Sequence, residues 1–162
     1  MLQERHLVVS NLSKAGNEDR HMLGTDFKHA EVGGILQQCA AYDSDAPTLV
    51  IYEGCSMYLS EQENRELMLS LRGALRNPDS VVWADMVTRS VVDGTTSSRP
   101  ITEFVNRMKE LGESFVFGCD EPAAFLEQCG FDVGSVVTAQ DYLSSSDSSL
   151  STYQFVVARV SV

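Results

Sequence analysis

A strand–helix–strand pattern near the middle of the chain constrains its fold more than any other feature. Residues 47–52 form a β-branched apolar run that ends before a Glu-Gly pair, which is typical of a strand buried in a parallel sheet. Ser60 and Glu63 then match the capping box, in which two side chains satisfy free backbone N–H groups at the start of a helix. Residues 80–85 form a second apolar run that ends in an acid. Two such strands joined by a helix lie parallel in one sheet.

The rest of the pattern extends this unit in both directions. A short strand is expected over residues 21–26, and residues 7–9 are compatible with another. Two strands with no helix between them close the chain and must pair antiparallel. We therefore predict an α/β fold with a mostly parallel sheet, helices on both faces and an antiparallel C-terminal hairpin. We expect a single domain, 1–162, in which residues 1–20 are poorly defined. Helices are expected over residues 31–41, 60–77, 104–111 and 120–129, and Asp120 is expected to cap the last of them. An exposed loop is expected over 91–100, and the closing strands over 131–139 and 153–160 around a Ser-rich tip.

The charge of the chain excludes two classes of partner. Twelve basic residues against 23 acidic ones give a formal net charge of −11. Nucleic-acid binding depends on Lys and Arg displacing counterions, and an anionic membrane surface is disfavoured for the same reason. No apolar run approaches the length of about 18 residues that suggests a membrane span. We expect no nucleic-acid partner and no membrane association.

The cysteines suggest a reduced, cytoplasmic protein. Cys39, Cys55, Cys119 and Cys129 are scattered, with no CxxC pair and no His at metal-ligand spacing. We therefore expect four free and mostly buried thiols and no metal site. The segment 54–57 does not match the G-x-S-x-G pattern, so a hydrolase nucleophile is not expected.

Beyond these general features, one stretch carries a family resemblance. Residues 46–60, Ala-Pro-Thr-Leu-Val-Ile-Tyr-Glu-Gly-Cys-Ser-Met-Tyr-Leu-Ser, closely resemble the fourth-strand motif of leucine carboxyl methyltransferases. Residues 20–27, before this motif, and residues 115–131 and 153–159, after it, are similar to other segments of that family, which occur there in the same order. The chain thus resembles the C-terminal portion of a class I S-adenosylmethionine-dependent methyltransferase, with a partial Rossmann-like sheet and without the family's N-terminal half.

This resemblance implies roles for five residues. Glu53, with Gly54, would lie by the amino-acid part of S-adenosylmethionine, where a carboxylate suits an ammonium group. Asp26 would accept from the adenine amino group, and Phe27 would pack on the adenine ring. Tyr58 would face the methyl-transfer region and orient the acceptor. Asp26 and Glu53 are expected at the carboxyl ends of two strands, where ligands of open parallel sheets bind.

The same resemblance leaves the function of the isolated chain open. No GxGxG turn precedes Asp26, and Gly33-Gly34 lies on the wrong side of it. We expect an O-methyltransferase acting on a carboxyl or hydroxyl oxygen of a small molecule or of a protein C-terminus, completed by self-association or by a complementary chain. The alternative is a non-catalytic interaction subunit, or a fragment. Asp85 is expected to be structural or to form a wall of the acceptor pocket.

Overall fold

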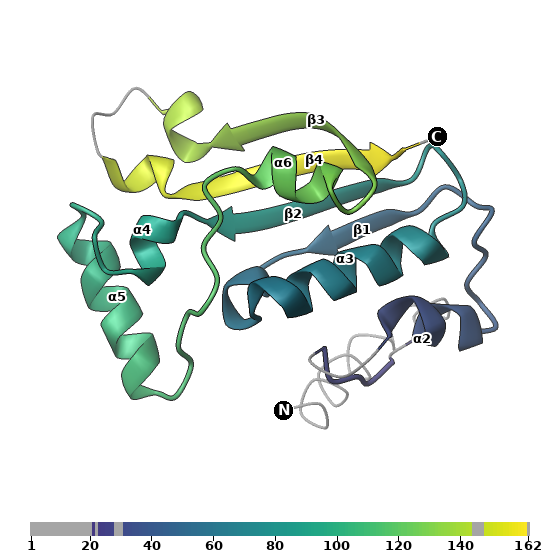
Figure 1. The fold of residues 1–162 in the computed structure, drawn as a ribbon, viewed down its shortest axis with the longest axis horizontal. Coiled ribbons are helices and arrows are strands. Elements are labelled where there is room, and N and C mark those ends of the chain that lie inside the picture. The colour runs from purple at the N-terminus through teal and green to yellow at the C-terminus, as the bar shows by residue number, and fades with distance from the viewer. Residues whose placement is uncertain (1–20, 22, 28–30, 144–147, 162) are drawn as a thin grey trace, which may run out of the picture.

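The computed structural model describes residues 21, 23–27, 31–143 and 148–161 (Figure 1). The expected strand at residues 7–9 lies outside this part of the chain. Short 3-10 turns occur at Ser56–Tyr58, Ala139–Asp141 and Ser148–Ser151. No helix among the described residues is long and apolar enough to cross a membrane. In chain order the main elements are α2 (Val32–Gln38), β1 (Leu49–Tyr52), α3 (Glu61–Ala74), β2 (Val81–Val87), α4 (Arg89–Val92), α5 (Arg99–Glu110), α6 (Pro122–Glu127), β3 (Phe131–Thr138) and β4 (Tyr153–Val160).

The four described strands form one sheet with the order β1-β2-β4-β3. β1 and β2 are parallel, and β4 is antiparallel to both of its neighbours, β2 and β3. Three strands therefore run in one direction and one in the other, as Figure 1 shows. The predicted strand–helix–strand unit and the antiparallel closing hairpin are both confirmed.

The capping box at the start of α3 is present in full. The Ser60 hydroxyl accepts from the backbone N–H of Glu63 at 3.2 Å, and the Glu63 carboxylate accepts from the backbone N–H of Ser60 at 2.6 Å. α2 packs against the outer side of this helix, where the N–H of Gly33 donates to the Ser70 hydroxyl at 2.8 Å. A Cβ at Gly33 would collide with the main chain of Ser70, so only glycine allows this approach.

Three details of the predicted element map are wrong. No strand forms over the described part of residues 21–26, because no described strand lies there to pair with it, and Asp26 does not end a strand. The expected loop 91–100 instead contains the end of α4 and the start of α5. Asp120 does not cap the helix that follows it. Its carboxylate accepts from the backbone N–H of Arg89 at 2.8 Å, at the start of α4.

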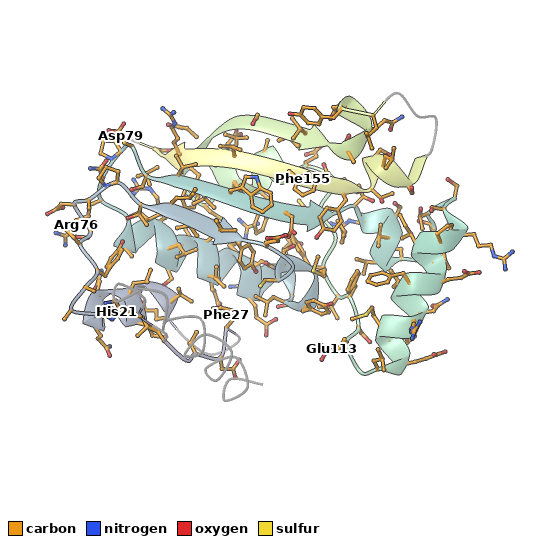
Figure 2. The ribbon with its side chains drawn as sticks, turned by 180° about the vertical axis from the view of Figure 1, so that it is seen from behind. His21, Phe27, Arg76, Asp79, Glu113 and Phe155 are labelled. Carbon is orange, nitrogen blue, oxygen red and sulfur yellow. The ribbon has the colours of Figure 1, made fainter. Side chains whose placement is uncertain are left out.

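The two faces of the sheet differ in what the described residues place over them. α3 and α6 cover one face, with α2 behind α3 (Figure 1). Seen from behind, no described helix lies over the middle of the other face, where Phe155 is visible (Figure 2). We call this second surface the open face. Its side chains alternate along the strands with those of the core and are Leu49, Ile51, Val81, Trp83, Phe155 and Val157.

Candidate active site

The loop that follows β1 is fixed by a carboxylate on the neighbouring strand. Glu53 comes directly after β1 and is exposed, and Gly54 has a φ of 64°, which costs a residue with a side chain about 1 kcal/mol or more. The N–H of Gly54 donates to both carboxylate oxygens of Asp85, at 3.0 Å each. The Ser56 hydroxyl donates to the backbone oxygen of Asp85 at 2.8 Å. Asp85 is fully buried and so holds the loop against the end of β2.

The last strand completes the environment of this carboxylate. The Tyr153 hydroxyl, at the start of β4, donates to Asp85 at 2.7 Å. Burial, followed by this hydrogen bond to the carboxylate, raises the pKa of Tyr153, which therefore remains a neutral phenol at physiological pH. Asp85 thus joins the loop after β1 to the first residue of β4.

A second buried polar residue holds the other end of the loop. Asn64, on α3, is fully buried. Its amide nitrogen donates to the backbone oxygens of Ser56 at 2.9 Å and Leu59 at 3.0 Å. Its amide oxygen accepts from the Tyr52 hydroxyl at 2.8 Å. Because the donors and acceptor of this amide are used, the path of the loop from residue 53 to residue 60 is set by the sheet and by α3 together.

Tyr58 lies on this loop, beside the segment that follows α5. Its ring meets that of Phe115 edge-on, with 5.2 Å between the centroids. The backbone oxygen of Met57 accepts from the N–H groups of Val116 at 2.8 Å and Phe117 at 3.3 Å, which ties the two segments together. Tyr58 is half-buried, and burial raises the pKa of its hydroxyl.

An apolar cavity of about 240 Å³ opens next to Tyr58, beyond the carboxyl ends of β1 and β2. It extends from Gly54 to α5 and to the first residue of β4. Side chains from the loop, β2, α4, α5 and the segment after α5 form its wall: Met57, Val87, Val91, Ile101, Phe104 and Phe115. A pocket of this kind, with a few polar groups at one end, is the usual form of a small-molecule site.

The structure unites only some of the residues singled out in the sequence. Glu53, Gly54 and Tyr58 lie on one loop at one end of the sheet. Asp26 and Phe27 lie on the segment before α2, where both side chains are exposed (Figure 2). No group of His, Cys, Asp and Glu among the described residues could hold a metal ion.

Sequence reasoning missed the residues that position this loop. Asp85 was expected to be structural or a pocket wall, and its hydrogen bonds make it structural. Nothing drew attention to Asn64 or to the Tyr153 hydroxyl. The available signals were an acid at the end of a buried strand and an amide on the apolar stripe of a helix, since buried polar groups need partners.

Comparison with known proteins relates this arrangement to methyltransferases. The family model for leucine carboxyl methyltransferases matches residues 1–71. A putative methyltransferase from Thermobifida fusca YX superimposes with a TM-score of 0.65 and 14% identity, over 96% of this chain and 59% of that one. The mitomycin 7-O-methyltransferase MmcR superimposes with a TM-score of 0.58 and 14% identity, over 94% of this chain and 38% of its own. A DUF574-family protein from Streptomyces avermitilis MA-4680 superimposes with a TM-score of 0.57 and 10% identity, over 85% of this chain and 54% of its own. No curated protein sequence matches the chain.

These matches agree with the sequence resemblance in different ways. The family match contains the motif at residues 46–60 that carried the resemblance. The solved structures support the fold alone, because their sequence identities are low. The chain spans from 38% to 59% of the length of the three structures.

Proposed function

We propose that this chain, which has the fold of class I S-adenosylmethionine-dependent methyltransferases and resembles the leucine carboxyl methyltransferases, takes part in methyl transfer to an oxygen atom. The observation that carries the proposal is the position of the loop 53–58. It begins at the carboxyl end of β1, where open parallel sheets bind their ligands, and it lies against an apolar cavity. Asp85 and Asn64 hold it there through buried hydrogen bonds.

The residues of the loop suit one end of S-adenosylmethionine. The Glu53 carboxylate is exposed, and a Cβ at Gly54 would meet no atom within 4 Å, so there is room for an ammonium group beside the strand end. When bound, the cofactor supplies a methyl group that is displaced in line, a reaction that depends on alignment more than on proton transfer. We assign Glu53 and Gly54 to the amino-acid end of the cofactor, and Tyr58 to orienting the acceptor oxygen through its hydroxyl.

Asp26 and Phe27 would serve the adenine end of the cofactor. Phe27 is 42% exposed, so its ring has a surface on which a base can stack. Asp26 would accept a hydrogen bond from the exocyclic amine of the adenine. Because these residues lie on a segment separate from the loop, we expect replacing them to weaken cofactor binding less than replacing Glu53.

A complete methyltransferase requires more polypeptide than the described residues supply. The Thermobifida structure is matched over 96% of this chain but only 59% of its own length. Among the described strands β1 has a neighbour on one side only, and Ile51 on β1 is 63% exposed. We infer that a complementary polypeptide, or a second copy of the chain, adds a strand to this edge and covers the open face.

Calorimetric titration of the purified chain with S-adenosylmethionine tests the cofactor assignment. Glu53→Ala should weaken binding about tenfold or more, as loss of a charge-assisted hydrogen bond does. Glu127→Ala is the matched control, because it removes the same charge from an exposed position on α6. No heat from folded protein, alone and with any partner that copurifies, would contradict the proposal, as would equal affinities for the two variants.

The open face also favours a second function, that of a non-catalytic interaction subunit. Its surface would bind a partner through apolar contact and pairing with β1, without need of a cofactor. Light scattering after size-exclusion chromatography distinguishes the two functions when combined with the titration. Ile51→Asp should abolish association, and Leu69→Asp, at an exposed position on α3, should not. Association without any cofactor binding would support the interaction subunit. A monomer that binds cofactor would oppose it.

A further inference from the structure

The cavity beside Tyr58 carries information about the chemistry of the acceptor. Apolar side chains form most of its wall, and four of the lining residues are aromatic: Tyr58, Phe104, Phe115 and Tyr153. The rings of Phe104 and Phe115 lie 6.2 Å apart with an interplanar angle of 67°. Such a wall offers ring faces and edges to a flat apolar ligand.

The polar groups of the cavity are neutral. Tyr58 and Tyr153 contribute hydroxyls, and Thr152 and Gly54 complete the polar lining. The Tyr153 hydroxyl already donates to Asp85 at 2.7 Å, so it can accept a hydrogen bond from a ligand but has no second proton to give.

The charges near these hydroxyls are acidic. Burial and then the charge of Glu113 raise the pKa of Tyr58. Burial and then the charges of Asp85 and Glu53 raise the pKa of Tyr153. None of the described residues that line the cavity is Lys or Arg. A carboxylate placed here would therefore lose its hydration without gaining a cation, and Asp85, 2.7 Å from the Tyr153 hydroxyl, would repel it.

A neighbouring hollow shows that the chain does place cations in other cavities. The space of about 330 Å³ between α3 and α6 is lined by Arg65 and Arg89. The hollow between α3 and α6 thus has two arginines among its lining residues, whereas none of the described residues that line the cavity beside Tyr58 is basic.

We propose that the cavity beside Tyr58 binds the methyl acceptor as an uncharged ring compound that carries a hydroxyl group, and that it discriminates against carboxylates. The inference rests on the proposed function and chooses between the carboxyl and hydroxyl acceptors that the sequence left open. The hydroxyl donates toward Tyr153 or Tyr58 while the ring packs against the wall that Phe104 and Phe115 form. A volume of about 240 Å³ limits the ligand to one or two rings.

Two ligands that differ only in the charged group test this inference. 2-Naphthol is neutral at pH 7 and 2-naphthoate is anionic, and both have the same ring system. Each is titrated calorimetrically into the full chain without S-adenosylmethionine. We expect 2-naphthol to bind at least about tenfold more tightly than 2-naphthoate. Equal affinities, tighter binding of 2-naphthoate, or no binding of 2-naphthol by folded protein would each overturn the inference.

A matched pair of variants locates the binding. Phe104→Lys brings a cation to the mouth of the cavity, at a position that is 55% exposed and therefore tolerant. Asn106→Lys adds the same charge to α5 at an exposed position that does not line this cavity. Phe104→Lys should lower the preference for 2-naphthol about tenfold, and Asn106→Lys should leave it within about twofold. Equal effects of the two variants would show that the ligand binds elsewhere and would overturn the inference.

The cofactor titration keeps this result separate from the proposed function. Preference for 2-naphthol without binding of S-adenosylmethionine would contradict the proposed methyl transfer but support a cavity that binds ring compounds. A chain that binds S-adenosylmethionine but prefers 2-naphthoate would keep methyl transfer and lose the hydroxyl acceptor.

Discussion

The two faces of the sheet are built from the same strands and have opposite surroundings. On the covered face, Val82, Ala84, Val156 and Ala158 are fully buried beneath α3 and α6. On the open face, Trp83 stacks on Phe155 with 5.6 Å between the ring centroids, and Leu49 and Ile51 are each 63% exposed. Large apolar side chains on a sheet that no described helix covers agree with the proposed binding of another polypeptide there. The strands therefore carry apolar side chains on both faces, and helices among the described residues cover one of these faces.

The largest expected difference is in the free energy of unfolding. Leu126→Ala, on the buried side of α6, should cost about 2–5 kcal/mol, because it leaves a cavity among buried neighbours. Ile51→Ala should change the stability by less than about 0.5 kcal/mol, since its side chain already meets solvent. Urea unfolding followed by circular dichroism measures both. Similar costs for the two variants would mean that the open face is covered in solution.

Asp85 is fully buried near the carboxyl end of β2 and should give the next largest effect. Asp85→Ala leaves the Gly54 N–H and the Tyr153 hydroxyl without their partner, which should cost about 1–3 kcal/mol. Asp85→Asn should cost less, because the amide oxygen still accepts one of these hydrogen bonds. Asp79→Ala, at an exposed position, is the control for loss of an acid. If the alanine variants at both positions unfold at the same urea concentration, the anchoring role is wrong.

The capping box should contribute a smaller amount to the covered layer. Ser60→Ala removes the acceptor for the Glu63 N–H and should destabilise the protein by about 0.5–2 kcal/mol. Ser135→Ala, at an exposed position on β3, should be close to neutral. Thermal unfolding of the two variants beside the unaltered chain measures the difference. A loss at Ser135 equal to that at Ser60 would argue against a role for the cap.

The reaction rates of the four cysteines should distinguish buried from partly buried positions, and this test needs no variant. Burial raises the pKa of Cys119 and Cys129, so at pH 8 they hold little thiolate. Cys39 and Cys55 are only partly buried and should react first with iodoacetamide. Raising the pH should speed the reaction of the buried pair, because more of each thiol ionises. Peptide mass mapping over time gives the order, and early labelling of Cys129 would contradict burial beneath α6.

Local signals made the centre of the fold predictable. The β1–α3 unit follows from a β-branched run and from a capping box whose partners are three residues apart. The error at Asp120 has the opposite origin, because its true partner is Arg89, 31 residues away. A strand at residues 21–26 was expected from composition alone, and a strand also needs a neighbour, which a local pattern cannot supply.

The site was predictable to the same extent. Glu53, Gly54 and Tyr58 are close in sequence, so one motif found them together. Asp85, which holds the loop, is 31 residues after Gly54 in the sequence. Tyr153, which donates to Asp85, comes 68 residues later still. No spacing rule connects residues so far apart. The cavity beside Tyr58 depends on α5, a helix expected from its periodicity but not expected to form part of a site.

β4 is the last of the described strands to leave the ribosome and lies between β2 and β3 in the sheet. Until it emerges, β3 has no partner among the described strands, and the Asp85 carboxylate lacks the Tyr153 hydroxyl. The loop after β1 can thus reach its final form only after Tyr153 has been synthesised. A chain that terminates early would carry the whole motif at residues 46–60 and still have no finished site.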